Sequence, residues 1–460
     1  MILIKPIFEE ERKKLNHYYP TEIVPENCWI DKNKIFLNVY DTEPIAKFSV
    51  DLKGYTFIDI EPYKNSMYYR DKMLSSKNLN FEETYELYKD AIEKKIRKSI
   101  DLTKEWITQY GETHKVVLSV SGGKDSELTR FILEKAYEEL VMEKNYRTIA
   151  FNTTNETAET YKALKHHYGL TKENIISPKV GWHKFIKENK NYYLPTTLSR
   201  YCCSTYKEGQ MKKEYKSSED LLIILGMRSH ESNKRSFYDY DLNKSWIDHY
   251  SKFPKNKRKP LNVPNNWKRF LPIVEFEDHE VWLAILHYGL YINPMYKLGF
   301  NRVGCLICPN MDSYSNYLII QYYSKQWERW VDIIEKNYEI YNIKKQLKWD
   351  IYEYVYDGHW KNFSSLEAKI LNRKQNDNDI EYLAYLKGCS EDVARKFYNK
   401  ECECGKKLNP KETGMYFKTI GMHECNYCLC KNCLCEKLCI DKREYNKIAM
   451  QYMNEGCNLF

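Results

Sequence analysis

The feature that most constrains the fold is a continuous, β-branched run at 115–120, followed at once by the hexapeptide SGGKDS at 121–126 and then by a helical pattern. Such a run is typical of a strand that is buried on both faces of a parallel sheet. Similar runs at 148–151 and 221–225 alternate with helical segments. This alternation predicts an α/β domain with a doubly wound, mainly parallel sheet over residues 111–310.

The rest of the 460-residue chain divides into four further segments. Short alternating runs separated by turn residues predict a β-rich unit at 1–80, and apolar residues at helical spacing predict a connecting helix at 81–110. Residues 311–400 are expected to form a helical region. Residues 401–460 form a Cys-rich module whose Lys/Glu-rich spacers are expected to provide little core, so that metal would supply its folding energy.

The composition narrows the class of protein. A hydrophobic content of 43% excludes wholesale disorder. No apolar run reaches the roughly 18 residues that a membrane span needs, which predicts a soluble, cytoplasmic protein without a membrane partner. The net charge of +8 permits a polyanionic partner without requiring one. In such a chain, 15 cysteines in groups indicate metal or cluster ligation more than disulfides.

The hexapeptide at 121–126 has the properties of a phosphate-binding loop. Gly122 and Gly123 let the backbone approach a phosphate closely, and the following helix presents N–H groups and a partial positive charge. Serine hydroxyls and Lys124 add hydrogen-bond donors. The spacing differs from that of Walker A, so transfer of a γ-phosphate is not the first hypothesis. The alternative is an ordinary glycine-rich turn between a strand and a helix.

SGGKDS after a strand resembles the PP-loop of the adenine nucleotide α-hydrolase superfamily, and further segments are similar to its phosphoadenosine phosphosulfate (PAPS) reductase-like family. Residues 152–160 resemble an Asp-Thr-Gly…Pro-Glu-Thr segment, with Asn152 and Thr154 in place of the Asp and the Gly. Residues 200–207 resemble Arg-x-Cys-Cys…Lys, and residues 226–235 resemble Gly-x-Arg-x-x-Glu-Ser…Arg. Residues 293–309 resemble the closing motif, which ends in Cys-x-x-Cys-Pro, and the whole resemblance covers residues 111–310.

The resemblance implies that ATP, or an adenylyl sulfate nucleotide, binds with its phosphates on the loop. Mg²⁺ would neutralise the pyrophosphate, with Asp125 as an indirect ligand, and Lys124 and Asp125 are the candidate catalytic residues of the loop. Arg and Lys side chains chelate phosphate oxygens, although any one of them is equally explained as a solvated surface charge. The candidate nucleotide-binding residues are Ser119, Ser121, Gly122, Gly123, Lys124, Asp125, Ser126, Asn152, Thr153, Arg200, Lys207, Arg228 and Arg235.

A first set of cysteines comprises Cys202, Cys203, Cys305 and Cys308. The two sulfur atoms of a Cys-x-x-Cys turn point toward one metal centre. The sulfur atoms of two adjacent cysteines converge less readily, but they can bind separate iron atoms of one cluster. The order of these residues resembles that of sulfonucleotide reductases, which implies a four-iron, four-sulfur (4Fe-4S) cluster on these thiolates. Zinc on the same thiolates, or plain buried cysteines, are the alternatives.

A second set of cysteines near the C-terminus predicts a zinc ribbon, which could hold either one metal ion or two. Its candidate Zn²⁺ ligands are Cys402, Cys404, Cys425, Cys428, Cys430 and Cys433, with Cys435 and Cys439 close by, and spacing does not say which of them bind. The segment Glu403-Cys404-Gly405 also matches the first half of the segment that carries the catalytic Cys of sulfonucleotide reductases. Cys404 is therefore an alternative candidate for a catalytic residue.

Cations and aromatic residues cluster at 252–259 and 267–269. A solvated loop is the simpler interpretation of this stretch. The alternative is a nucleic-acid contact, because such clusters follow a phosphate backbone and stack on bases.

Together with the resemblance, these residues predict a PP-loop sulfurtransferase that uses ATP to adenylate an acceptor. By analogy the acceptor is DNA or tRNA, and the sulfur donor is a protein such as a cysteine desulfurase or a thioredoxin-like reductant. One alternative is a sulfonucleotide reductase, an oxidoreductase that acts on adenylyl sulfate or PAPS. Another is a catalytically inactive nucleic-acid-binding scaffold subunit.

Overall fold

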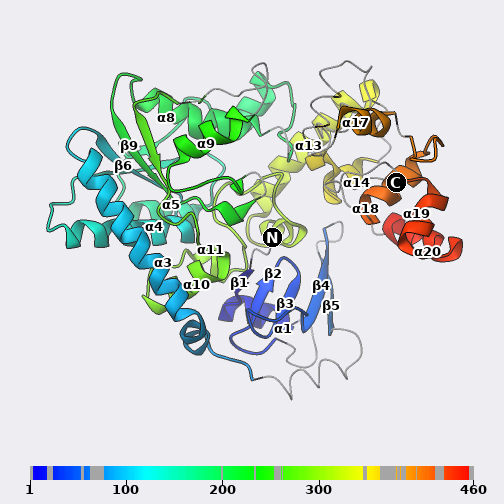
Figure 1. Ribbon diagram of the computed structural model, residues 1–460, viewed down its shortest axis with the longest axis horizontal. Helices are drawn as coiled ribbons and strands as arrows, with labels where there is room; N and C mark the ends of the chain where they lie inside the picture. The colour runs from blue at the N-terminus through cyan, green and yellow to red at the C-terminus, as the bar shows by residue number, and fades with distance from the viewer. Residues whose placement is uncertain are drawn as a thin grey trace. The chain divides into compact units, whose positions relative to one another are not determined.

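The computed structural model describes residues 4–17, 24–52, 56–62, 77–197, 200–232, 235–252, 261, 263–345, 350–362, 380, 384, 390–399, 401–419 and 429–454. It divides into two compact units, of which the first comprises Met1–Tyr193 and Tyr201–Lys336 and the second Leu194–Arg200 and Asn337–Phe460 (Figure 1). Within the described ranges no helix is long and apolar enough to cross a membrane.

The N-terminal part of the first unit is a five-stranded antiparallel sheet whose strand order follows the sequence. Trp29, Ile30, Ile35 and Phe36 are buried in it, as expected for short strands rich in aromatic and β-branched residues. Its elements are β1 (Ile4–Pro6), α1 (Glu9–His17), β2 (Trp29–Asp31), β3 (Lys34–Phe36), β4 (Ala46–Asp51) and β5 (Thr56–Pro62). The β-rich character predicted for this part of the chain is confirmed.

A long helix, α3 (Phe81–Tyr110), follows the antiparallel sheet. Asn80 caps it: its side chain accepts a hydrogen bond from the Glu83 N–H, while the Glu83 side chain accepts one from the Asn80 N–H. Tyr85, Ile92 and Ile96 lie on its buried face at the spacing of helical turns. The helix predicted over 81–110 therefore has the bounds that its sequence indicated.

The second sheet has five parallel strands in the order β10-β9-β6-β7-β8. Val117 and Ile223 pack on one face against Met211 of α8, whereas α4 contacts β6 and β9. Alternate residues of a strand point to opposite faces, and Val116, Leu118 and Ile224 are buried as well, so helices cover both faces. The strands are β6 (Lys115–Val120), β7 (Arg147–Phe151), β8 (Ile175–Ile176), β9 (Leu221–Leu225) and β10 (Trp267–Phe270). The predicted α/β fold is confirmed.

The helices after β6 in the first unit include segments that connect the parallel strands and segments that follow them. They are α4 (Lys124–Glu139), α5 (Ala158–His166), α6 (Trp182–Lys184), α7 (Tyr201–Cys203), α8 (Gly209–Glu214), α9 (Leu242–Ser251), α10 (Asp278–His287), α11 (Pro294–Lys297), α12 (Ser313–Tyr322) and α13 (Ser324–Lys345).

The second unit is helical and has a hydrophobic core of its own. Tyr416 of α18, Leu434 of α19 and Tyr445 of α20 are buried together with Cys402 and Cys430. The expectation that this module has little core is therefore wrong, because apolar residues spaced along its helices gather on one side despite the charged spacers. Its helices are α14 (Ile351–Tyr356), α17 (Glu391–Tyr398), α18 (Pro410–Thr419), α19 (Lys431–Leu438) and α20 (Lys442–Asn454).

Candidate functional site

The SGGKDS loop lies at the carboxyl end of β6, where the strand order of the parallel sheet reverses. β7 and β8 lie on one side of β6 in the sheet, and β9 and β10 lie on the other. In open α/β sheets the loops after the two strands at such a reversal diverge and leave a crevice that binds ligands. The loops in question are 121–123, after β6, and 226–228, after β9. The topology therefore puts the hexapeptide at the position where this class of fold binds nucleotides.

The loop is held in shape by its own hydroxyl groups and by glycine. Gly122 has φ +76, in the left-handed region that favours glycine. The Ser121 N–H donates to Oγ of Ser126 at 2.9 Å, which closes the loop onto the first turn of α4. Gly123 is the N-cap of α4, and the start of a helix is a type of site at which backbone N–H groups bind anions.

The closing motif at 293–303 packs directly on the loop. Nδ2 of Asn293 donates to the Gly122 carbonyl at 3.0 Å. The Lys124 N–H donates to the hydroxyl of Tyr296 at 3.1 Å. A Cβ added at Gly123 would lie 3.1 Å from that hydroxyl and 3.6 Å from Cβ of Val303. Two motifs that are far apart in the sequence thus form one structure.

Four charged side chains, Lys124, Asp125, Arg228 and Asp278, form a closed ring beside the loop. Nζ of Lys124 lies 2.9 Å from Oδ2 of Asp125 and 2.9 Å from Oδ1 of Asp278. Arg228 donates from Nε to Oδ1 of Asp125 at 2.7 Å and from Nη2 to Oδ1 of Asp278. We call this set the charge ring.

The charge ring is largely shielded from solvent. The exposed fraction of the side chain is 7% for Lys124, 1% for Arg228, 8% for Asp278 and 19% for Asp125. Burial alone would raise the pKa of Asp125, but the charges of Arg228 and Lys124 outweigh it and lower that pKa to about 2. Burial opposes the charge of Lys124, yet Asp125 and Asp278 keep the pKa of its amine above the usual value. The ring thus holds two positive and two negative charges in balance.

The remaining candidate nucleotide-binding residues lie on other segments. Asn152 and Thr153 follow β7, where Nδ2 of Asn152 donates to Oγ of Ser177 at 3.1 Å. Arg235 forms an ion pair with Glu231 in the segment after β9. Arg200 belongs to the second compact unit. Sequence reasoning missed Asp278, because its only signal is an acidic residue at the start of a helix.

The first set of cysteines lies on two segments of the same unit. Cys202 and Cys203 are in α7, and Cys305 and Cys308 are in the segment before α12. A hydrogen bond with Cys203, burial and the charges of Cys203, Cys305 and Cys308 all raise the pKa of Cys202. Burial raises the pKa of Cys305 to about 11, an effect that the charge of Lys207 opposes. Cys202 is therefore close enough to the other three thiols for their charges to act on it, but within the described residues these four sulfur atoms do not converge at metal-binding distance as those of the second unit do.

The loop after β7 connects these cysteines to the sheet. Oγ1 of Thr153 lies 3.4 Å from Sγ of Cys305. Nδ2 of Asn155 donates to the Ile307 carbonyl at 2.8 Å, and the Asn155 carbonyl accepts from the Leu306 N–H. The Cys-x-x-Cys segment is thus fixed to the carboxyl end of β7, next to the strand that carries the phosphate loop.

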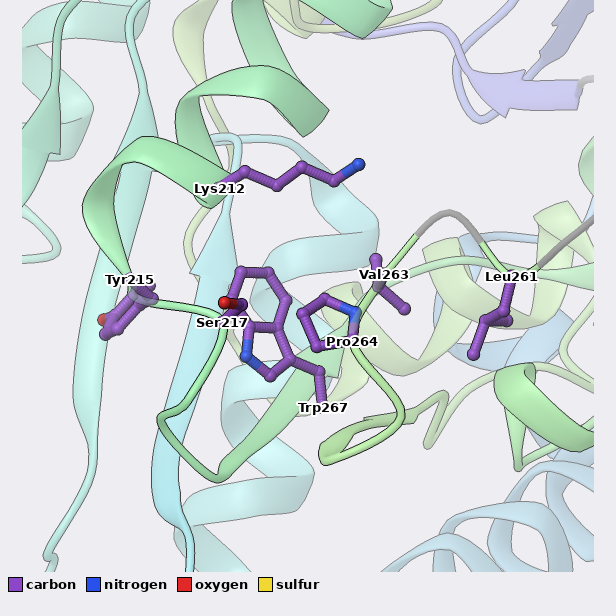
Figure 2. Close-up of a pocket in the computed structure, with 7 residues that line it drawn as sticks. All are labelled: Lys212, Tyr215, Ser217, Leu261, Val263, Pro264 and Trp267. Atoms are coloured by element: carbon purple, nitrogen blue, oxygen red, sulfur yellow. The ribbon is translucent and has the colours of Figure 1, made fainter.

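A separate cavity of about 350 Å³ lies at the other end of the sheet (Figure 2). Lys212, Tyr215 and Ser217 precede β9, and Val263, Pro264 and Trp267 lead into β10, so the cavity is at the amino ends of these strands. Ligands of open α/β sheets bind at the carboxyl ends, so this cavity is not the candidate nucleotide site.

Of the basic, aromatic stretch, Trp267 is buried and is the first residue of β10, so it is not exposed to stack on a base. Residues 253–260 of this stretch lie outside the described residues.

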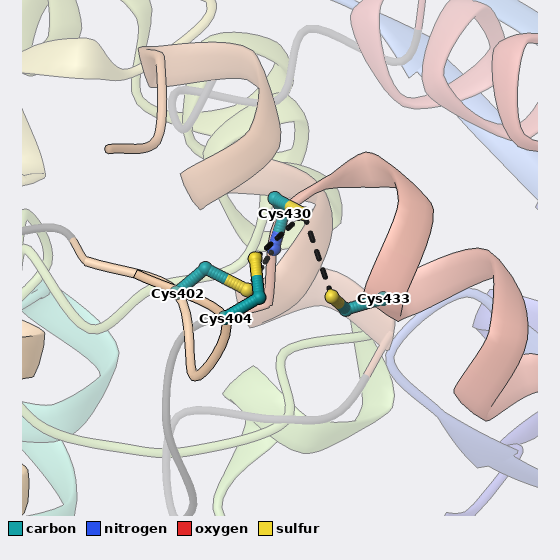
Figure 3. A group of neighbouring side chains, drawn as sticks. All are labelled: Cys402, Cys404, Cys430 and Cys433. Carbon is teal, nitrogen blue, oxygen red and sulfur yellow. Dashed lines mark hydrogen bonds between the residues drawn. The ribbon is translucent and has the colours of Figure 1, made fainter. Parts of the chain in front are cut away.

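In the second unit, the side chains of Cys402, Cys404, Cys430 and Cys433 converge (Figure 3). Their sulfur atoms all lie within 4.8 Å of one another, with Cys404 to Cys430 at 3.8 Å and Cys430 to Cys433 at 3.6 Å. A tetrahedral zinc site with bonds of about 2.3 Å has sulfur atoms about 3.8 Å apart. The four-cysteine centre therefore has the dimensions of a site for a single metal ion.

Local backbone structure explains why these four cysteines meet. Cys402 and Cys404 belong to a tight turn in which the Cys402 N–H donates to the Lys406 carbonyl and Gly405 has φ +82. Cys430 is the N-cap of α19, and Cys433 lies in the first turn of that helix. The candidates Cys425 and Cys428 lie outside the described residues. The four-cysteine centre can hold a metal ion without them.

Residues 115–311 match the model of the phosphoadenosine phosphosulfate reductase domain. This segment belongs to the PAPS reductase domain family. The resemblance inferred from the motifs is thereby confirmed, and the family implies binding of an adenine nucleotide. The match covers the phosphate loop, Arg228, Asp278 and the first set of cysteines.

Three relatives and one solved structure are similar to parts of the chain. Two uncharacterized proteins of Methanocaldococcus jannaschii are 28% and 25% identical over 50% and 54% of this chain, covering 43% and 54% of their own lengths. The adenosine 5'-phosphosulfate reductase of Allochromatium vinosum is 19% identical over 33% of this chain and 53% of its own. The chain thus spans about half the length of these relatives. The solved structure is a phosphate complex of the phosphoadenylyl-sulfate reductase of Candida auris. The match covers 44% of this chain and 87% of that one, with 13% sequence identity and a TM-score of 0.31.

Replacing Gly226 by alanine is expected to disturb the phosphate loop. A Cβ at this position would lie 2.7 Å from the carbonyl oxygen and 2.9 Å from the carbonyl carbon of Asp125, both backbone atoms that have little room to move. Overpacking of this kind costs about 1–3 kcal/mol. We therefore expect a lower thermal midpoint and weaker binding of ATP in a titration. Gly181→Ala is the control, since Gly181 has an ordinary φ of −67 and its Cβ would meet its nearest atom, Oγ1 of Thr154, at an ordinary contact distance of 3.4 Å. Equal nucleotide binding by Gly226→Ala and wild type would contradict the prediction.

Proposed function

We propose that the protein is an ATP-dependent enzyme that adenylates an acceptor for sulfur transfer. The observation that supports this most is the position of the SGGKDS loop at the strand-order reversal, where Asn293 and Tyr296 pack on it. Because membership of the PAPS reductase domain family implies binding of an adenine nucleotide, ATP is the proposed ligand of this loop.

In the proposed reaction an oxygen of the acceptor attacks the α-phosphorus of ATP. The bond between that phosphorus and the bridging oxygen breaks, and pyrophosphate leaves with the bonding electrons. The N–H groups at the start of α4 would stabilise the charge that develops on pyrophosphate, and Mg²⁺ would neutralise it further. The adenylated oxygen is then a good leaving group, which departs as part of AMP when a sulfur nucleophile attacks the acceptor.

Cys202, Cys203, Cys305 and Cys308 would hold a 4Fe-4S cluster close to this reaction. Four cysteine thiols are the soft donor set that such a cluster requires, and the interactions of Cys202 with the other three support this assignment. When bound, the cluster would supply sulfur or electron-transfer chemistry. Oγ1 of Thr153, which donates its proton to Glu156, lies 3.4 Å from Sγ of Cys305, and the Lys207 charge would favour the thiolate form of that cysteine.

The four-cysteine centre of the second unit is the proposed zinc site. Its sulfur–sulfur distances of 3.6 and 3.8 Å fit one tetrahedral ion. This also favours a ligand role for Cys404 over the redox-catalytic role.

A nucleic acid is the proposed acceptor, because the chain carries a net charge of +8 and zinc modules commonly bind such polyanions. A persulfide-carrying protein is the proposed sulfur donor.

Reduction of a sulfonucleotide is the second candidate, and the similarity to the adenosine 5'-phosphosulfate reductase of Allochromatium vinosum favours it. In that reaction the same loop would hold the phosphate of the substrate, and a thiol would release sulfite. A Cys404 that is bound to zinc would not be available as the nucleophile for this step.

One assay separates the two reactions. Anaerobically purified protein is incubated with labelled ATP and candidate acceptors, and separately with adenylyl sulfate and a thiol. We expect pyrophosphate and AMP from ATP, iron with a broad visible absorption band, and loss of both iron and activity in Cys305→Ser. Cys28→Ser, which changes a buried cysteine of the N-terminal sheet, is the control and should keep its iron. Sulfite release without pyrophosphate would establish the reductase instead, and a colourless preparation would exclude the cluster.

A further inference from the structure

Asp278 completes the charge ring from an element that no sequence motif highlighted. It is the first residue of α10, and its Oδ1 lies within ion-pair distance of both Lys124 and Arg228. Lys124 comes from the phosphate loop, and Arg228 comes from the segment after β9. Asp278 is therefore the shared counter-ion of two cations that reach the crevice from two different strands.

The charge balance of the ring depends on this one carboxylate. Lys124 and Arg228 carry two positive charges, and Asp125 alone offsets one of them. Buried charges interact strongly because little water screens them, so a surplus positive charge here would act on any anion bound to the loop. With Asp278 in place the ring is neutral, and the loop attracts phosphate through its N–H groups instead of through excess charge.

We infer that Asp278 is a positioning residue that offsets the positive charge of Lys124 and Arg228 beside the SGGKDS loop. It thereby limits the affinity of the loop for polyphosphate anions. The inference rests on the proposed function and extends it. An enzyme that releases pyrophosphate in every cycle is slowed if it binds that product too tightly. Asp278 holds Lys124 and Arg228 in fixed positions. It also reduces the net positive charge that would otherwise strengthen the binding of pyrophosphate.

The variant Asp278→Asn tests this inference, because it keeps the shape of the side chain and removes its charge. We expect the full-length variant to bind inorganic pyrophosphate about ten-fold more tightly than wild type in a calorimetric titration at low, fixed ionic strength. We also expect its thermal midpoint without pyrophosphate to fall by several degrees, since a buried cation loses its partner. A residue with a merely structural role would lower the midpoint without raising the affinity.

Glu280→Gln is the matched control. Glu280 lies on the same helix, is buried, and pairs with Lys95 at 2.6 Å, but it does not belong to the charge ring. Its replacement should lower the thermal midpoint and leave the affinity for pyrophosphate unchanged. A gain in affinity in both variants would show that a general loss of negative charge explains the result, and the inference would be wrong.

The double variant Lys124→Met with Asp278→Asn restores the charge balance, because one cation and one carboxylate remain. It should recover part of the thermal midpoint lost in Asp278→Asn and lose the gain in affinity. If Asp278→Asn does not fold, the double variant must fold for the inference to stand. Equal or weaker pyrophosphate binding by Asp278→Asn, with binding intact in wild type, would overturn the inference alone. If wild type binds neither pyrophosphate nor ATP, the proposed function fails as well.

Discussion

Replacing Arg228 by methionine is expected to lower the free energy of unfolding by about 3–5 kcal/mol, because two buried carboxylates would then share one lysine. Arg228 also donates from Nη1 to the Phe276 carbonyl at 3.2 Å, and that carbonyl would lose a donor. Chemical denaturation followed by circular dichroism measures the change. The matched control is Arg97→Met, since Arg97 also pairs with two carboxylates, those of Asp101 and Glu139, but is half-exposed on the surface. Surface pairs contribute about 0–1 kcal/mol, so similar losses in the two variants would contradict the prediction.

The same variant should change the response to acid. The pKa of Asp125 in the folded protein is about 2, below the ordinary value of 3.8, so its ionised form favours folding at pH values above 3.8. That contribution is lost as the pH falls through the folded pKa of about 2. Without Arg228 the effect of burial prevails and the pKa of Asp125 rises. The difference in the free energy of unfolding between wild type and Arg228→Met should therefore be largest near neutral pH and become smaller as the pH falls toward 2, because wild type then loses the contribution of ionised Asp125 while protonation relieves the variant of a buried charge. A difference that does not change with pH would contradict this.

Replacing Cys402 by serine is expected to remove one zinc ion per chain and to destabilise the second unit by several kcal/mol. A tetrahedral thiolate site that loses one ligand binds zinc far more weakly, and the energy of binding contributes to folding. Because the module also has its own hydrophobic core, we expect a lowered thermal transition and not complete unfolding. Metal analysis by mass spectrometry and calorimetry of the full chain measure the two effects.

Cys439→Ser is the control for that variant. Cys439 follows α19, is exposed and does not belong to the four-cysteine centre. Its replacement should leave the zinc content and the thermal transition as in wild type. Treatment with a zinc chelator should reproduce the effect of Cys402→Ser in the wild type and add little to the variant. Retention of one zinc ion by Cys402→Ser would show that other residues hold the metal.

Local signals in the sequence were sufficient to predict the central strands and the long helix, but not β8 or β10, of which β10 lies in the stretch interpreted as a loop. The parallel strands β6 and β9 have the bounds of continuous apolar runs, because a strand buried on both faces admits few polar residues. Helix α3 begins at a capping box and ends before Gly111, so its bounds are also determined by nearby residues. The position of SGGKDS between a strand and a helix could also be predicted, because both neighbouring segments have clear local patterns.

The partners within the site could not be predicted, because they depend on tertiary contacts. Arg228 was identified as a phosphate ligand from its motif, whereas the structure shows it buried against Asp125 and Asp278. Nothing in the local sequence indicates that Asp278 meets Lys124, since the two lie on different helices. Likewise, spacing could not select Cys402, Cys404, Cys430 and Cys433, because the core that packs α18, α19 and α20 brings them together.

The strand order also determines when the nucleotide crevice can form as the chain folds. β6 pairs in register with β7, which follows it closely, and also with β9, so that Lys115 lies opposite Leu221. A nascent chain that ends before Leu221 would expose one side of β6 as an unpaired edge, which favours misassembly. Truncated products of this region should therefore aggregate, and the SGGKDS loop can gain its contacts with Asn293 and Tyr296 only after those residues have been synthesised.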